Sequence, residues 1–177
     1  MKKTITSLLV TGVVILSLQF TSAQEFSQGT NVINVGIGFG GYYYGYDTSS
    51  QSPLFNISYE RGIWEMPGPG IISLGGYFGY KSFVNNSQSV DYDWTYSIIG
   101  VRGAYHYTGF EIEHLDVYGG VMATFNIYNG TGGDDFESRP GATPFVGGRW
   151  YFSDEFAAFA EGSYGVAFLT LGVSFRF

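Results

Sequence analysis

The final stretch of the sequence alternates apolar residues with small or polar ones. Its odd positions are apolar and its even positions are not: Leu169, Leu171, Val173, Phe175 and Phe177 against Thr170, Gly172, Ser174 and Arg176. Because successive side chains of a β-strand point to opposite faces, the pattern predicts a strand with one apolar and one polar face, ending at the last residue. Soluble sheets and membrane barrels both contain such strands, so other features must decide what the apolar face meets.

The same two-residue period recurs in seven earlier segments. Aliphatic and aromatic residues occupy one face and glycine or polar residues the other, although alanines blur the pattern in the seventh segment. The predicted strands cover residues 33–40, 54–61, 71–83, 94–107, 116–128, 142–152 and 156–164. The stretches between them are polar or rich in turn-forming residues and predict loops at residues 47–52, 62–70, 84–93, 129–141 and 153–155. With the terminal strand, the prediction is eight strands.

Charged residues within these strands keep to the glycine-rich face. They are Glu60, Lys81, Arg102, Asp116, Arg149, Glu161 and Arg176, and the exception is Arg61 at a strand end. A charge on the lipid face of a membrane barrel costs about 2–4 kcal/mol near the bilayer midplane, so a bilayer enforces this segregation. A soluble sheet would carry more charge and fewer glycines on its solvated face. The sequence therefore predicts an all-β, eight-stranded antiparallel up-and-down transmembrane barrel.

Aromatic residues gather near the predicted strand ends. They are Tyr42, Tyr43, Tyr44, Tyr80, Trp94, Tyr105, Tyr107, Tyr128 and Trp150. Amphipathic rings favour the boundary between lipid and water, so we expect these residues to form two interfacial girdles.

The first 23 residues have the pattern of a secretory signal peptide. Lys2 and Lys3 precede an apolar stretch, and small residues lead up to Ala23. A retained membrane anchor would need about 20 apolar residues, and this stretch is too short. We expect cleavage between Ala23 and Gln24, which leaves one barrel domain over residues 24–177 and no transmembrane helix.

Composition excludes several kinds of partner. The sequence contains no cysteine, which rules out disulfides, thiolate metal sites and a lipid-modified N-terminal cysteine. Removing Lys2 and Lys3 with the leader leaves six basic residues against 15 acidic ones, a net charge of −9. This balance argues against nucleic acid as a partner.

The chain resembles the small eight-stranded outer-membrane barrels of the OmpA and OmpX type, often grouped as porin-family barrel domains. The resemblance covers residues 24–177, and its most specific parts are GVRGAYH (100–106), LDVYGG (115–120), GRWYF (148–152) and GVSFRF (172–177). It implies a monomer in the bacterial outer membrane that contacts membrane lipid and lipopolysaccharide. It also implies that Phe175 and Phe177 present a signal to the outer-membrane assembly machinery.

Candidate sites for cofactors and metals have simpler interpretations. Residues 36–41 match the spacing G-x-G-x-x-G, but a dinucleotide site needs a helix next and the following tyrosines do not predict one. Asp134, Asp135 and Glu137 lack the ordered spacing of a calcium loop, and a solvated loop is favoured. We therefore expect no cofactor and no metal.

The two histidines raise the question of catalysis. Some outer-membrane barrels are lipid-modifying enzymes that use a histidine beside a serine and a carboxylate. In the predicted topology, His106 lies inside the barrel near the periplasmic end and His114 lies in a periplasmic turn, so neither reaches the outer leaflet. We therefore do not expect an enzyme.

The charges Arg102, Arg149 and Glu161 form the strongest candidate cluster inside the barrel. The short link 153–155 places Arg149 opposite Phe159 and diagonal to Glu161, within reach of a long side chain. An arginine–carboxylate pair in a narrow barrel can fill the interior as a plug or act as a gate or selectivity ring. Eight strands leave an interior that side chains just fill, which favours the plug.

Three functions stay open from the sequence. The favoured one is a structural or surface-interaction role in the bacterial envelope. A narrow porin-like channel for ions or small solutes is the alternative, and a lipid-modifying enzyme is the third.

The signal-peptide prediction can be checked by mass. Mass spectrometry of the protein isolated from the envelope should give a chain that begins at Gln24, because the small residues before this position suit signal peptidase. A mature protein that still carries Lys2 and Lys3 would contradict cleavage.

Overall fold

The computed structural model describes residues 26–41, 50–87, 90–130 and 138–177, which leaves Ala23 and Gln24 outside the described residues. These ranges contain nine strands and, among them, no helix long and apolar enough to cross a membrane. The strands are β1 (Asn31–Phe39), β2 (Ser50–Gln51), β3 (Leu54–Glu65), β4 (Gly70–Ser87), β5 (Val90–Tyr107), β6 (Leu115–Gly130), β7 (Arg139–Tyr151), β8 (Phe156–Ser163) and β9 (Leu169–Arg176).

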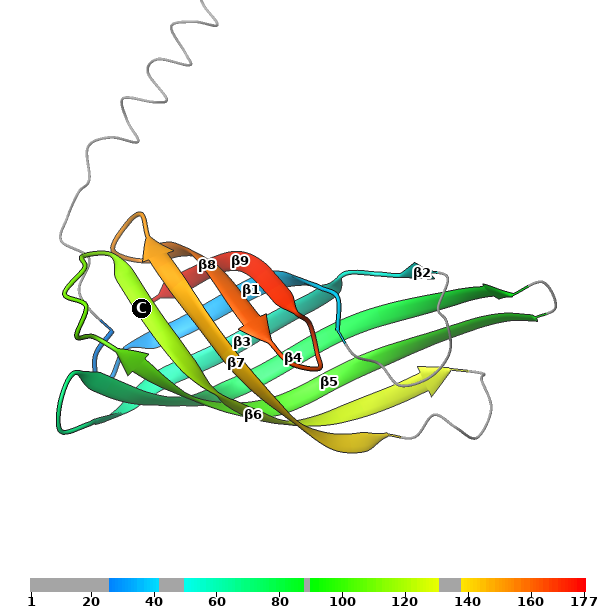
Figure 1. The fold of residues 1–177 in the computed structure, drawn as a ribbon, viewed down its shortest axis with the longest axis horizontal. Coiled ribbons are helices and arrows are strands. Elements are labelled where there is room, and N and C mark those ends of the chain that lie inside the picture. The colour runs from blue at the N-terminus through cyan, green and yellow to red at the C-terminus, as the bar shows by residue number, and fades with distance from the viewer. Residues whose placement is uncertain (1–25, 42–49, 88–89, 131–137) are drawn as a thin grey trace, which may run out of the picture.

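Eight of these strands close into a barrel (Figure 1). Each strand from β3 to β8 pairs antiparallel with the next along the chain, and β1 pairs with both β3 and β9. The β1–β9 seam runs from Val32 opposite Arg176 to Phe39 opposite Leu169. The two-residue β2 only adds to the far end of β4. The predicted eight-stranded antiparallel barrel is therefore confirmed.

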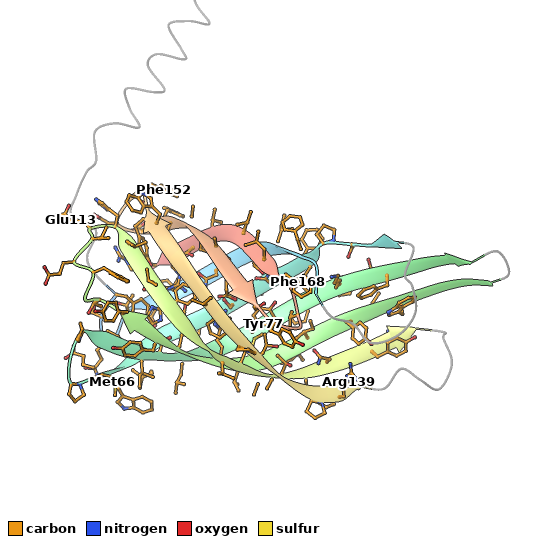
Figure 2. All side chains as sticks on the ribbon, viewed as in Figure 1. Met66, Tyr77, Glu113, Arg139, Phe152 and Phe168 are labelled. Carbon is orange, nitrogen blue, oxygen red and sulfur yellow. The ribbon has the colours of Figure 1, made fainter. Side chains whose placement is uncertain are left out.

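Side chains alternate between the outside and the inside of this wall, and the outside is the apolar one (Figure 2). On β3, Phe55, Ile57 and Tyr59 are exposed while the polar residues between them are buried. Val101 is 68% exposed, whereas the neighbouring Arg102 is 3% exposed. The predicted faces are confirmed, including the burial of Glu60, Lys81, Arg102, Asp116, Arg149 and Glu161, with Arg176 half-buried and Arg61 exposed.

The two ends of the barrel differ, and we name them by their contents. The terminal end holds Phe26, Phe177 and the turns at residues 66–69, 108–114 and 152–155 (Figure 1). The hairpin end holds the projecting β4–β5 hairpin and the turn at residues 164–168. Both ends carry an apolar closure. Phe26 packs with Val32 and Ile71 at the terminal end, and Val166 and Ala167 pack at the hairpin end in a cluster with Leu54, Tyr77, Ile98, Ala104, Tyr118, Met122 and Phe145.

The strands at the hairpin end are longer than the sequence pattern predicts. The ladder between β4 and β5 continues to Ser87 opposite Val90, through most of the predicted loop 84–93. β6 and β7 likewise reach into the predicted loop 129–141. These segments are polar in composition, which is why the sequence pattern predicted loops. However, two paired strands satisfy each other's backbone groups whatever their side chains are, so the pairing continues beyond the strand segments with apolar outward faces.

The prediction that Trp94 and Tyr128 belong to the outward-facing aromatic girdles is wrong. Trp94 is 5% exposed and Tyr128 is partly buried, and both belong to an inward aromatic cluster with Phe83 and Tyr96. The rings of Phe83 and Trp94 stack with centroids 5.2 Å apart. Strand parity explains the error, because Trp94 shares the face of the fully buried Ile98. Tyr80, Tyr105, Tyr107 and Trp150 do point outward, and residues 42–44 lie outside the described residues.

Phe177 offers a test of the terminal strand. Its N–H donates to the carbonyl of Asn31 (3.0 Å), and its exposed ring stacks with Phe175 at 5.7 Å. Phe177→Ala keeps the backbone bonds and removes only the ring, so the refolded barrel should lose about 0.5 kcal/mol or less. If the terminal aromatic is the assembly signal, the amount of barrel in the outer membrane should nevertheless fall several-fold.

Phe152→Ala is the matched control, because Phe152 is equally exposed (61% against 60%) at the same end of the barrel. Immunoblots of outer-membrane fractions report the levels. Equal amounts of the two variants would contradict a special role for the last residue.

Candidate functional site

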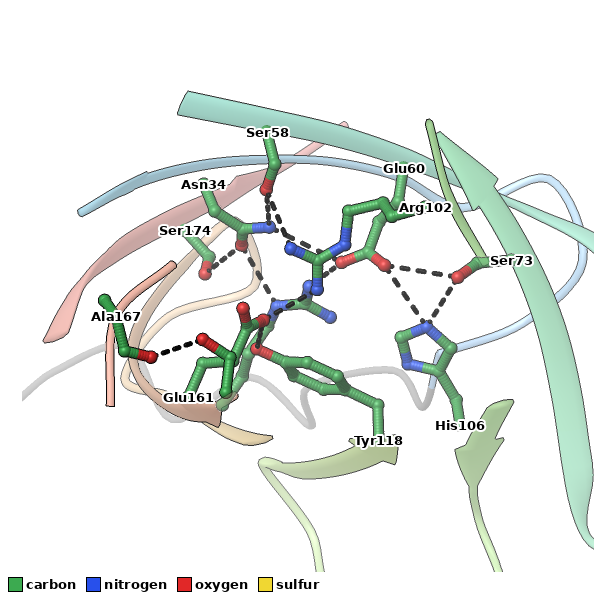
Figure 3. A network of polar contacts seen from close by, with 12 residues as sticks. Asn34, Ser58, Glu60, Ser73, Arg102, His106, Tyr118, Glu161, Ala167 and Ser174 are labelled. Carbon is green, nitrogen blue, oxygen red and sulfur yellow. Dashed lines mark hydrogen bonds and ion pairs between the residues drawn. The ribbon is translucent and has the colours of Figure 1, made fainter. Parts of the chain in front are cut away.

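The lumen between the two apolar closures holds a connected set of polar side chains (Figure 3). Every barrel strand contributes at least one of them, since the set comprises Asn34, Ser58, Glu60, Ser73, Arg102, His106, Asp116, Tyr118, Arg149, Glu161 and Ser174. We call this set the lumen network. It is the candidate functional site.

Arg149 lies at the centre of the lumen network and is fully buried. Its Nη1 donates to Asp116 Oδ2 at 2.6 Å, and its Nη2 forms an ion pair with Glu60. Its Nε donates to Asn34 Oδ1 at 3.2 Å, and its guanidinium lies over the Tyr118 ring at 4.4 Å. The guanidinium thus joins β7 to β1, β3 and β6. Because the charge is paired on several sides, its burial can be tolerated.

Arg102 forms the second ion pair, with Glu161. Its Nη2 donates to Glu161 Oε2 at 2.6 Å, and the same oxygen accepts a hydrogen bond from the Tyr118 hydroxyl at 3.2 Å. The guanidinium also lies 4.0 Å above the Phe145 ring, which belongs to the hairpin-end closure. This pair therefore links the ion pairs of the lumen network to the apolar closure at the hairpin end.

Ser73, His106 and Asp116 form a line of hydrogen bonds on the terminal side. Ser73 Oγ lies 2.9 Å from His106 Nε2, and His106 Nδ1 lies 2.8 Å from Asp116 Oδ1. Ser73 also donates to Glu60 Oε2 at 3.1 Å. The ring of Phe26 stacks on the His106 ring with centroids 3.6 Å apart and covers it. His106 lies inside the barrel, as predicted, and His114 lies in the 108–114 turn.

The predicted pairing of Arg149 with Glu161 is wrong. The ladder places Arg149 opposite Phe159, as expected. Arg149 nevertheless turns to Glu60 and Asp116, and Glu161 pairs with Arg102. The prediction considered neighbouring strands only, whereas a closed barrel brings side chains from distant strands together across the lumen.

Sequence reasoning placed Glu60, Asp116 and His106 on the inner face but did not include them in the cluster. Asn34, Ser58, Ser73, Tyr118 and Ser174 were missed as members. Their only sequence signal is strand parity, which marks every one of them as inward-facing. Parity does not show which inward side chains meet, because that depends on the stagger of the strands around the closed ring.

The other candidate sites gain no support from the geometry. Residues 36–39 are the end of β1, and no helix begins in the described residues that follow. Asp134, Asp135 and Glu137 lie outside the described residues. Within the described ranges, no group of three or more His, Cys, Asp or Glu side chains could hold a metal ion.

Comparison with known proteins identifies the fold. No protein-family model and no curated protein matches the sequence. The crystal structure of Ail, the attachment invasion locus protein of Yersinia pestis, in complex with the heparin analogue sucrose octasulfate, matches with a TM-score of 0.55 and 15% sequence identity over 85% of this chain and 99% of that chain. The N-terminal β-barrel domain of Pseudomonas aeruginosa OprF matches with a TM-score of 0.46 and 16% identity, over 85% and 98%.

The likeness to Ail confirms the fold that the resemblance inferred from the sequence implies. This chain has the fold of the small eight-stranded barrels of the bacterial outer membrane, the OmpA-like fold.

Removing Glu161 tests whether the lumen is packed. Glu161→Ala leaves the buried Arg102 guanidinium without its carboxylate, and breaking a buried ion pair costs about 3–5 kcal/mol. Urea unfolding of the barrel refolded into lipid vesicles measures the loss. Glu113→Ala, which removes an exposed carboxylate from the 108–114 turn, should change stability by about 0.5 kcal/mol or less. A loss of about 1 kcal/mol or less for Glu161→Ala would indicate a water-filled lumen in which the charges are screened.

Proposed function

We propose that this chain is an integral barrel of the bacterial outer membrane with a closed lumen and a structural or surface-interaction role in the envelope. The exposed apolar belt supports the membrane location, since Val101, Val121 and Val146 are each more than half exposed. A closed barrel also pairs the backbone groups of all its strands, which a lipid environment requires. The longer strands of the hairpin end suit the outside of the cell, and the short turns at residues 66–69 and 152–155 of the terminal end suit the periplasm.

The main support for a structural or surface-interaction role is that side chains fill the lumen. Arg149, Glu60 and His106 are 0% exposed, so bulk water does not reach these three side chains in the described structure. Phe26 closes the lumen on one side of this layer, and Val166 and Ala167 close it on the other. A barrel filled in this way offers its two ends and its outer wall for interaction, and the hairpin end is the part that meets the exterior.

The alternative functions have less support. A narrow channel would require the lumen network and both apolar closures to move apart together. The Ser73, His106 and Asp116 distances resemble those of a hydrolytic triad. However, Ser73 is 1% exposed, and Phe26 covers His106, so a substrate has no access to the hydroxyl. We therefore propose a structural role for the lumen network as a whole and for its line of Ser73, His106 and Asp116.

The partners we propose follow from the exposed surface and from the family resemblance. The apolar belt contacts membrane lipid and lipopolysaccharide as a monomer, and the C-terminal strand engages the assembly machinery through Phe175 and Phe177. The Ail crystal contains a highly sulfated heparin analogue. The mature form of this chain has a net charge of −9 with only six basic residues. This charge does not favour an extended sulfated polymer as its partner.

Planar-bilayer recording tests the closed lumen. The purified barrel, checked for folding by its heat-modifiable gel mobility, should give no stepwise conductance above that of a protein-free detergent control. Glu161→Ala should weaken the fold without creating a selective pore. Conductance steps in the wild type, together with a changed ion selectivity and unchanged stability in Glu161→Ala, would overturn the plug and favour the channel.

A further inference from the structure

Arg61 departs from the rule that charged side chains of the barrel strands point inward. It lies on the outer face of β3 and is exposed, whereas its neighbour Glu60 is 0% exposed on the inner face. Within the described ranges, its guanidinium forms no ion pair and no hydrogen bond with the protein. A charge on the lipid-facing wall is costly at the bilayer midplane and tolerated near the interfaces. The level of Arg61 along the barrel therefore decides what it meets.

Arg61 lies where the outer wall changes from apolar to polar. It pairs with Asn31, the first residue of β1, while Ile57 and the other exposed apolar residues of β3 lie farther from the terminal end. The Tyr59 hydroxyl donates to Asn31 Oδ1 at 2.8 Å, and the Asn31 N–H donates to the carbonyl of Phe177, the last residue, at 3.3 Å. A phenol hydroxyl and a chain terminus suit the boundary between lipid and water. Arg61 therefore lies at the headgroup level of one leaflet.

A β-bulge places a second hydrogen-bond donor beside Arg61. The register between β3 and β4 shifts just before Trp64, so that Arg61 is opposite Leu74 and Trp64 is opposite Ile72. Leu74 and Ile72 are two residues apart on one face of β4, so Arg61 and Trp64 are neighbours on the outer face. Trp64 is 52% exposed, and its indole N–H makes no hydrogen bond within the part of the chain that the structure describes.

An open pocket of about 560 Å³ lies beside the guanidinium. Arg61, Gly62 and Ile63 line it from β3, and Gln28 and Gly29 line it from the segment before β1. Gln28 Nε2 donates to the Ile63 carbonyl at 2.8 Å, and the Gly29 N–H donates to the Gly62 carbonyl at 2.9 Å, which fixes the two sides to each other. Pockets of about 300–1,000 Å³ hold drug-sized molecules, so this one has room for a lipid headgroup.

We propose that Arg61 and Trp64 bind the phosphate of a phospholipid in the leaflet at the terminal end. Guanidinium N–H groups bind phosphate oxygens in pairs, and the indole N–H supplies a further donor. The headgroup extends over the pocket, and the acyl chains follow the exposed apolar face toward Ile57. The mature chain has a net charge of −9, so recognition has to come from these local groups. The proposal rests on the membrane location proposed above and adds a specific lipid site to it.

Native mass spectrometry of the barrel, refolded in detergent and checked by heat-modifiable gel mobility, measures the bound lipid. The probe is dioleoylphosphatidylethanolamine, which has no net charge and is therefore not repelled by the acidic barrel. A first molecule should bind more tightly than further ones. Dioleoylglycerol, which has the same chains and no phosphate, should bind about tenfold more weakly. Glycerol 3-phosphate in excess, which has the phosphate and no chains, should not displace the phospholipid.

Variants locate the binding at Arg61. Arg61→Gln should weaken phosphatidylethanolamine binding about tenfold, the effect of losing charge-assisted hydrogen bonds. Trp64→Phe keeps an aromatic ring and removes the N–H, so it should weaken binding about threefold. Arg176→Gln is the matched control, because it removes the same charge at the same end of the barrel. The Arg176 guanidinium is already engaged, since its Nε donates to the Asp154 carbonyl at 2.9 Å and it lies over the Tyr151 ring, so this variant should bind as the wild type does.

Three results would overturn the proposal. Equal binding by the wild type and Arg61→Gln would remove the site from Arg61, and equal binding of dioleoylglycerol would remove the role of the phosphate. Displacement by glycerol 3-phosphate would assign the site to soluble phosphate esters instead of lipid. Flotation with vesicles tests the membrane location separately, because the wild type and Arg61→Gln should both insert. A wild type that inserts but retains no phospholipid refutes the site alone, whereas failure to insert refutes the proposed location.

Discussion

Pairing of buried charge across the lumen is the interaction on which this barrel depends. In the outer-membrane location that we propose, lipid outside the wall leaves the interior as the place for charged side chains within the membrane span, and eight strands leave an interior barely wide enough to hold them. Arg102 and Arg149 are buried there with Glu60, Asp116 and Glu161, and direct ion pairs join them. Because the partners come from different strands, each pair also ties parts of the wall together.

The layers above and below the lumen network follow from this pairing. The Coulomb attraction within an ion pair is strongest where water is excluded, and the lumen network lies between the buried Phe26 at one end and the buried Val166 and Ala167 at the other. Beyond the second closure the inner face becomes polar again at Thr124 and Thr143, which line a cavity of about 150 Å³ at the hairpin end. The same strands thus carry the buried lumen network, then the apolar closure and then the polar cavity, in that order along the barrel.

The sequence predicts which side chains face inward better than it predicts what they contact. A period of two residues identifies the inner face of every strand, so the burial of Arg102, Arg149 and Glu161 could be predicted from their positions alone. Their pairing could not, because Arg149 reaches Glu60 and Asp116 on strands that the linear pattern does not relate to it. The length of the β4–β5 hairpin could not be predicted for a different reason. The residues between Val84 and Asp93 are mostly polar and therefore predict a loop, although their backbones pair.

A double-mutant cycle on Arg102 and Glu161 tests the central claim most directly. The free energy of unfolding in lipid vesicles is measured for the wild type, Arg102→Met, Glu161→Met and the double variant. If the pair is buried in a dry lumen, each single change leaves one charge unpaired, and the double variant should be at least as stable as either single variant, with a coupling energy of about 2–3 kcal/mol. Losses that add to within about 0.5 kcal/mol would show that the two charges act independently, and would contradict a barrel held closed by its lumen network.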